Sequence, residues 1–136
     1  MKAELKLKTL SPDEIASAVG GKLIKCGAGA ARAVTNITYD SRDVSDGSLF
    51  CAIKGERVDG HDYIKDVVEK GCAVVLAERK PDGAETFGSY CMVIVDDSVR
   101  AIGLLSGYYR TFSSAKIVGQ IRHLGSLGAA MRRGNG

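Results

Sequence analysis

Two short apolar runs on either side of a helical pattern constrain the fold of this chain most strongly. Residues 49–53 and 72–77 are almost entirely apolar, as is typical of strands that are buried on both faces of a sheet. Between them, Tyr63, Ile64 and Val67 recur at helical spacing. A strand, a helix and a second strand in this order predict two parallel strands joined by a right-handed crossover.

The remaining segments continue this alternation of helices and strands. Ser11 is a good N-cap, Pro12 suits the first helical position and Glu14 completes a capping box, which predicts a short helix that ends at residues 20–21. Apolar runs bounded by turn residues predict three further strands, at residues 22–25, 34–39 and 91–95. The expected fold class is α/β, with a small, mixed, partly parallel sheet flanked by helices.

A last helix is expected from residue 99 to about residue 112, after a cap at residues 96–98. Its expected inward positions are Ile102, Leu105, Tyr108 and Tyr109. We interpret the two tyrosines as packing residues rather than as a stacking platform, because they continue the apolar spacing of the helix.

Length and charge indicate one globular domain without a nucleic-acid partner. The 136 residues are 45% hydrophobic and 26% charged, a balance that suits a single core of ordinary size. Residues 1–119 hold 16 Lys and Arg against 16 Asp and Glu, so the net charge of +3 comes from Arg122, Arg132 and Arg133. A neutral body lacks the basic face that nucleic-acid binding requires.

The sequence also argues against a membrane or metal partner. No apolar run approaches the roughly 20 residues of a membrane helix, and the charged N-terminus lacks an apolar signal core, so a cytoplasmic location is expected. The cysteines form no close pair of the kind found in zinc or redox motifs, and we interpret Cys51, Cys72 and Cys91, which lie at or inside apolar runs, as small buried hydrophobes. The four cysteines stand at Cys26, Cys51, Cys72 and Cys91.

Polar residues follow two of the expected strands. Asp40-Ser41-Arg42 places a hydroxyl and a guanidinium directly after the strand at residues 34–39. The strand at residues 49–53 is followed by Lys54-Gly55-Glu56-Arg57, in which two cations flank a glycine that permits close backbone approach. The two loops are therefore candidates to converge on one phosphorylated ligand.

These segments, in this order, resemble the N-terminal domain of the Mur ligase family, which builds the peptide stem of bacterial cell-wall precursors. The resemblance also includes residues 10–16, residues 20–23 and Asp59-Gly60-His61-Asp62, and it runs from about residue 10 to residue 119. The opening helix and the loop at residues 54–57 are most similar to the members that add D-alanyl-D-alanine to the UDP-MurNAc-tripeptide. Two alternatives stay open: a member that adds the third stem residue, and a non-catalytic interaction module that kept the fold.

The resemblance implies a domain that holds the UDP part of a UDP-MurNAc-peptide. Ser41 would hydrogen-bond the uridine or its diphosphate, and Arg42 would offer its charge and planar fork. The other implied UDP-binding residues would line the uracil and ribose side; they are Lys54, Gly55, Glu56 and Arg57.

Neighbouring residues of the motif are expected to have structural roles. Asp40 is expected to bond backbone N–H groups in its corner, and His61 to cap or brace a helix start rather than to catalyse. No catalytic residue is proposed. Taken without the resemblance, Arg42 and Arg57 would be interpreted as members of surface ion pairs with Asp43, Glu56 or Asp59.

The expected domain boundary lies at residues 115/116. Residues 1–115 would form the UDP-substrate domain, and residues 116–119 resemble the strand that opens the family's central ATP-binding domain. No Gly-x-x-x-x-Gly-Lys-Ser/Thr follows, and residues 120–136 form a tail that departs from the family and is expected to be disordered. Residues 1–136 are thus expected to bind no cofactor, since ATP and Mg²⁺ belong to the central domain, and to be inactive alone. They are also expected to self-associate through the surface that the missing domains would cover.

Overall fold

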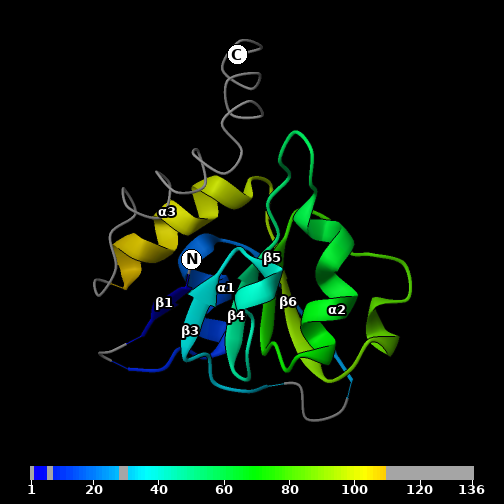
Figure 1. Cartoon of the computed structure of the whole chain (residues 1–136). Helices are drawn as coiled ribbons and strands as arrows, with labels where there is room; N and C mark the ends of the chain where they lie inside the picture. Colours follow the sequence, from blue (N-terminus) through cyan, green and yellow to red (C-terminus); the bar gives the residue numbers. More distant parts are fainter. Residues whose placement is uncertain (1, 6–7, 28–30, 110–136) are drawn as a thin grey trace.

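A six-stranded sheet covered by helices on both faces forms the described part of the chain (Figure 1). The computed structural model describes residues 2–5, 8–27 and 31–109. The strands are β1 (Lys2–Glu4), β2 (Lys22–Cys26), β3 (Asn36–Thr38), β4 (Ser48–Cys51), β5 (Val74–Ala77) and β6 (Tyr90–Ile94). The α-helices are α1 (Pro12–Val19), α2 (Ile64–Glu69) and α3 (Ser98–Tyr108), and short 3-10 turns are η1 (Ser41–Asp43), η2 (Gly60–Tyr63) and η3 (Ala84–Thr86).

The sheet is mixed and partly parallel, as the sequence predicts. Its strand order is β1-β3-β4-β5-β6-β2. The four inner strands run parallel, with Phe50 opposite Val75 and Val75 opposite Met92, whereas β1 and β2 pair antiparallel to β3 and β6 at the two ends of the sheet. The carboxyl ends of β3, β4, β5 and β6 therefore meet at one edge.

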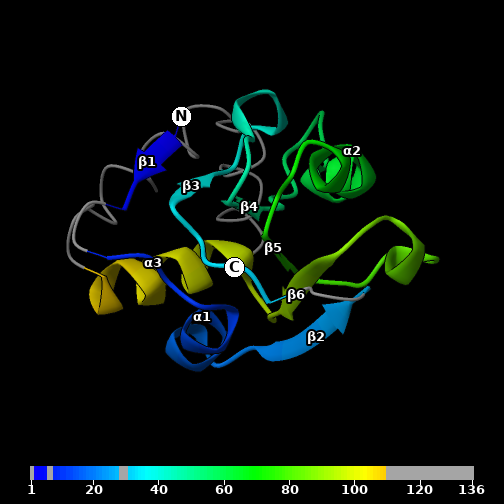
Figure 2. The same cartoon turned by 90° about the horizontal axis from the view of Figure 1, so that it is seen from below.

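Two apolar cores lie on opposite faces of the sheet. Helices α1 and α3 cover one face and α2 covers the other (Figure 2). Along β4, Leu49 packs in the first core and Phe50 in the second, so the strand is buried on both sides. This double burial explains why the inner strands are continuous apolar runs in the sequence.

The first helix forms as its capping signals predict. Ser11 Oγ accepts the Glu14 N–H at 3.1 Å, and the Glu14 carboxylate accepts the Ser11 N–H at 3.1 Å. The helix ends at Gly20, whose φ of 66° is a left-handed conformation that glycine adopts without strain. Ile15 and Val19 are buried on its inner face.

Three features differ from the expectations. Strand β1 was not predicted, although its alternation of charged and apolar residues suits the outermost strand of a sheet. The strand expected at residues 34–39 shortens to Asn36–Thr38, and Val34 forms only an isolated bridge with Leu10. The inward position expected for Tyr108 is wrong, because this residue is 50% exposed and its hydroxyl donates to Glu14.

The end of α3 is held by Tyr109 instead. This side chain is buried, as expected, and its hydroxyl accepts the Lys8 N–H at 2.8 Å and donates to the Lys8 carbonyl at 2.7 Å. The helix is described to Tyr108, so its expected extension to residue 112, the strand at residues 116–119 and the tail at residues 120–136 lie outside the described residues.

All four cysteines are free and buried; the burial was predicted for Cys51, Cys72 and Cys91, and Cys26 shares it. Burial raises the pKa of the Cys51 and Cys72 thiols to about 12, so both remain protonated and unreactive. Within the described ranges, no helix has the length and apolar character needed to cross a bilayer.

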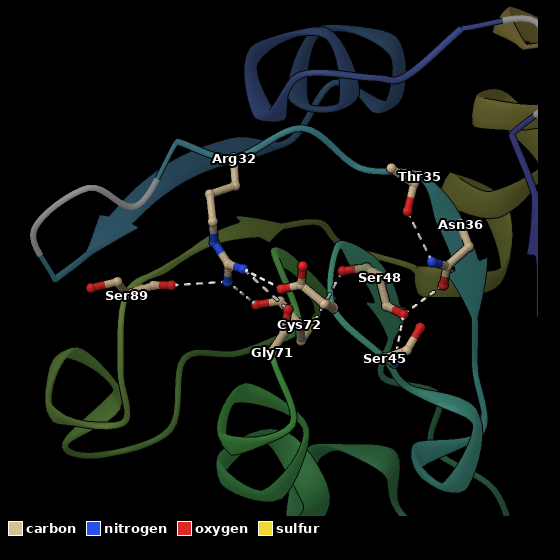
Figure 3. A network of polar contacts seen from close by, with 9 residues as sticks. Arg32, Thr35, Asn36, Ser45, Ser48, Gly71, Cys72 and Ser89 are labelled. Carbon is tan, nitrogen blue, oxygen red and sulfur yellow. Dashed lines mark hydrogen bonds and ion pairs between the residues drawn. The ribbon is translucent and has the colours of Figure 1, made fainter.

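A polar network closes the amino-terminal edge of the parallel strands (Figure 3). The Arg32 guanidinium donates to the carbonyls of Gly71, Cys72 and Ser89 at 3.3, 2.8 and 3.2 Å, and to the Asp46 carboxylate at 3.1 Å. One side chain thereby joins the segments that enter β4, β5 and β6. The opposite, carboxyl-terminal edge carries the predicted site residues.

Candidate functional site

A polar segment follows each parallel strand at the carboxyl-terminal edge. Residues 40–42 follow β3, residues 54–59 follow β4, residues 78–79 follow β5 and residues 96–98 follow β6. Ligands of open α/β sheets bind outside the carboxyl ends of the strands, so this edge is the candidate site.

The corner after β3 is organised by Asp40. Its carboxylate accepts the Arg42 N–H at 2.9 Å, and the Arg42 side chain donates from Nε to Oδ1 at 3.0 Å and from Nη2 to Oδ2 at 2.7 Å. These hydrogen bonds from Arg42 hold the pKa of Asp40 at about 2. The structural role expected for Asp40 is confirmed.

The two residues predicted to bind UDP in this corner, Ser41 and Arg42, differ in the partners of their side chains. Arg42 pairs with Asp40, a partner not among those expected for a surface ion pair, yet its side chain is 83% exposed. The Ser41 carbonyl accepts the Lys70 ammonium at 2.9 Å. Among the described residues the Ser41 hydroxyl has no hydrogen-bond partner, so it is available to a ligand.

The segment after β4 is a tight hairpin at residues 54–59. Lys54 and Asp59 face each other in an antiparallel bridge, and the Gly55 N–H donates to the Val58 carbonyl at 2.8 Å. A Cβ on Gly55 would lie 3.0 Å from that carbonyl oxygen, so glycine permits the close turn. The hairpin presents the side chains of Lys54, Glu56, Arg57 and Val58 to solvent.

The base of this hairpin is fixed by a second carboxylate. Asp59 accepts the His61 N–H at 3.0 Å, the His61 ring Nδ1 at 2.7 Å and Arg79 Nη2 at 3.0 Å. Partial burial raises the pKa of Asp59, but the hydrogen bonds from His61 and Arg79 outweigh it and hold this pKa at about 2. Asp59 is therefore ionised at neutral pH.

His61 connects the hairpin to the next strand. Its Nε2 accepts the Glu78 N–H at 2.9 Å, which leaves Nδ1 to donate its proton to Asp59. The bracing role expected for His61 is confirmed, with Asp59 as the cap of η2. Nearby, the Ser98 N–H donates to the Glu78 carboxylate at 2.9 Å and the Ser98 hydroxyl donates to the Ala52 carbonyl at 3.0 Å.

The predicted residues thus fall into two groups on adjacent strands. Ser41 and Arg42 follow β3, and Lys54 to Arg57 follow β4, the neighbouring parallel strand. The ion pair considered between Arg57 and Glu56 or Asp59 is not formed in the described part of the chain, since Arg79 takes the Asp59 carboxylate. Sequence reasoning missed Arg79, although its position two residues after a buried strand was a usable signal.

The mostly parallel sheet thus carries cationic loops at its carboxyl-terminal edge, where ligands of open α/β sheets bind. Residues 33–101, about half of the chain, match the sequence model described as "Mur ligase family, catalytic domain". The chain belongs to the Mur ligase family and corresponds to an N-terminal region of its members.

The relatives include Mur ligases that differ in the residue named as added. A UDP-N-acetylmuramoyl-L-alanyl-D-glutamate--2,6-diaminopimelate ligase of Parabacteroides distasonis is 40% identical over 85 residues, which are 62% of this chain and 17% of the relative. A UDP-N-acetylmuramoyl-tripeptide--D-alanyl-D-alanine ligase of Treponema pallidum is 35% identical over 107 residues, which are 74% of this chain and 23% of the relative.

A solved structure gives the same family. The UDP-N-acetylmuramoylalanyl-D-glutamyl-2,6-diaminopimelate--D-alanyl-D-alanyl ligase from Acinetobacter baumannii superposes with a TM-score of 0.62 and 29% identity, covering 75% of this chain and 22% of that protein. The chain spans 17% to 23% of the lengths of these relatives. The family and fold inferred from the sequence are confirmed.

Proposed function

We propose that this region recognises the UDP-MurNAc-peptide substrate of a Mur ligase and holds the UDP part at the carboxyl-terminal edge of its sheet. The observation that carries the proposal is the placement of two cation-bearing loops after the adjacent parallel strands β3 and β4. A diphosphate carries negative charge at neutral pH, and cations on neighbouring strand ends attract it from two sides.

Arg42 is suited to contact a phosphate. Asp40 already fixes its direction through two hydrogen bonds, so little side-chain entropy is lost when a ligand binds. The guanidinium keeps further N–H groups for an anion because it carries five donors in all. The Ser41 hydroxyl, one residue earlier, supplies a donor to the same ligand.

The hairpin at residues 54–59 suits the uracil and ribose side. Gly55 carries no side chain, so a ligand can approach its backbone closely. Lys54 and Arg57 are exposed beside it and supply positive charge. Glu56 is also exposed, and its carboxylate can accept hydrogen bonds from the ribose hydroxyls. The turn is held by its own backbone hydrogen bond and therefore exists before the ligand arrives.

For the parent enzyme we favour the ligase that adds D-Ala-D-Ala to UDP-MurNAc-tripeptide in peptidoglycan synthesis. The Treponema pallidum relative aligns over more of this chain, and the solved structure is of this kind. The higher identity of the diaminopimelate-adding relative favours the alternative, addition of the third stem residue. Under either assignment ATP and Mg²⁺ would bind outside the described residues, and the location would be the cytoplasm.

An NMR titration of the 136-residue chain tests the proposal. UDP, UDP-MurNAc-dipeptide and UDP-MurNAc-tripeptide are added separately to the wild type, to Arg42→Ala and to Lys25→Ala, which removes an equal charge from β2. Saturable shifts at Ser41, Arg42 and residues 55–57 that Arg42→Ala alone weakens are expected. No shifts with millimolar ligand would instead indicate an interaction module that kept the fold.

The same titration separates the two ligases. Tighter binding of the tripeptide derivative than of the dipeptide derivative supports the D-Ala-D-Ala-adding ligase. The reverse order supports the ligase that adds the third residue.

A further inference from the structure

We propose that His61 is a positioning residue that holds the hairpin at residues 54–59 in its ligand-ready conformation. Its consequence for binding rests on the function proposed above. The His61 side chain is only 2% exposed, and both ring nitrogens are hydrogen-bonded to different segments of the chain. It is too deeply buried to contact a ligand at the surface, so any effect on binding is transmitted through its partners.

The imidazole joins the hairpin to β5. Through Nδ1 it bonds Asp59, whose backbone pairs with Lys54 on the other side of the hairpin. Through Nε2 it bonds the Glu78 N–H, the first residue after β5. The direction in which the hairpin leaves the sheet is therefore set by a ring held between two strand ends.

The Asp59 carboxylate also orients Arg79. Asp59 Oδ2 accepts Arg79 Nη2 at 3.0 Å, while Oδ1 is occupied by the backbone and ring of His61. Arg79 is 57% exposed and stands beside the hairpin at the carboxyl-terminal edge. His61 thus fixes the acceptor that orients Arg79, and its loss would disturb the cation together with the hairpin.

Two substitutions at His61 each keep one of the ring's two hydrogen bonds and remove the other. His61→Asn keeps a donor near the position of Nδ1 and loses the acceptor for the Glu78 N–H. His61→Gln places an amide oxygen near the position of Nε2 and so restores that acceptor. Ile102→Val, in the buried face of α3, is the matched control because it loosens the core on the opposite side of the sheet from α2.

The measurements use the full 136-residue chain. Amide hydrogen exchange at Gly55 and Glu78 is followed without ligand, and the UDP dissociation constant is measured by calorimetry. His61→Asn should speed exchange at both amides and weaken UDP binding about fivefold, the equivalent of one lost neutral hydrogen bond. His61→Gln should restore slow exchange at Glu78 but not at Gly55, because the bond to Asp59 stays lost, and Ile102→Val should change exchange at neither amide.

Several results would overturn the positioning role. Unchanged exchange at Gly55 in His61→Asn would do so, as would equal effects of His61→Asn and Ile102→Val. The imidazole ¹⁵N shifts of the wild type provide a test that needs no variant, because they must show the proton on Nδ1. If the wild type does not bind UDP, the proposed function fails, while faster exchange at Gly55 in His61→Asn would still support the positioning role.

Discussion

Substitution of Gly60 by alanine should destabilise the fold for a purely steric reason. A Cβ at this position would lie 2.8 Å from the Ile53 nitrogen, 3.1 Å from the Ala52 Cα and 3.2 Å from the Ile53 carbonyl oxygen. These are backbone atoms of the two residues that follow β4, and they cannot rotate away. The Gly60 N–H also donates to the Ile53 carbonyl at 2.8 Å, so the two segments must separate or lose this bond.

The expected loss is about 2–4 kcal/mol in the free energy of unfolding. Overpacking of a close contact costs about 1–3 kcal/mol, and a strained or broken backbone hydrogen bond adds about 1 kcal/mol. Gly103→Ala is the matched control: it lies within α3, and a Cβ there meets nothing within 4 Å. Because alanine favours helix over glycine, this control should stabilise the protein by about 0.5–1 kcal/mol.

Urea unfolding of the 136-residue chain measures both changes. The midpoint should fall for Gly60→Ala and rise for Gly103→Ala, with the dependence on urea concentration unchanged for both. A Gly60→Ala midpoint within error of the wild type would refute the steric reasoning. So would destabilisation of similar size by Gly103→Ala.

Three further outcomes are expected. Ser11→Ala removes the α1 capping box and should cost about 1 kcal/mol in urea unfolding, whereas no loss would show that the cap is dispensable. The pKa values of Asp40 and Asp59 are lowered from 3.8 to about 2, so the stability they contribute is present above about pH 4 and is lost as the pH falls toward 2. Asp59→Asn should flatten this acid dependence in thermal melts, and an unaltered pH profile would contradict the assignment. Tyr109→Phe should cost about 1–2 kcal/mol through the lost bonds to the Lys8 backbone, and Tyr108→Phe under about 0.5 kcal/mol; equal losses would be inconsistent with their burial.

The sequence predicts best those helices and strands that are determined by residues close together in the chain. Ser11 and Glu14 are three residues apart and satisfy each other, so the start of α1 is evident from four consecutive residues. The almost entirely apolar composition around β4 and β5 predicts that these strands are buried on both faces, as they are. Strand β1 escaped prediction because three residues that pair with distant Asn36–Thr38 carry little signal of their own.

In the candidate site, too, contacts between residues close in sequence were easier to predict than contacts made by the tertiary fold. Its two loops were expected to converge because each follows a predicted strand, and the structure places these strands side by side as β3 and β4. The Asp59 and His61 contacts were only partly foreseeable. Their spacing of two residues is local, but the bond from the Glu78 N–H joins positions 17 residues apart through the tertiary fold. The contacts of Arg32 were even harder to predict from sequence, since its acceptors are spread from Asp46 to Ser89.

The antiparallel outer strands have a consequence for aggregation. The inner strands are continuous apolar runs, the composition most prone to pair with other copies when a strand edge is bare. Here that composition lies between β1 and β2, which carry Lys2 and Glu4 at one end of the sheet and Lys22 and Lys25 at the other. At the β2 end, edge-to-edge pairing with a second copy would bring these lysines together and strip their hydration, so this order of the strands opposes the formation of fibres.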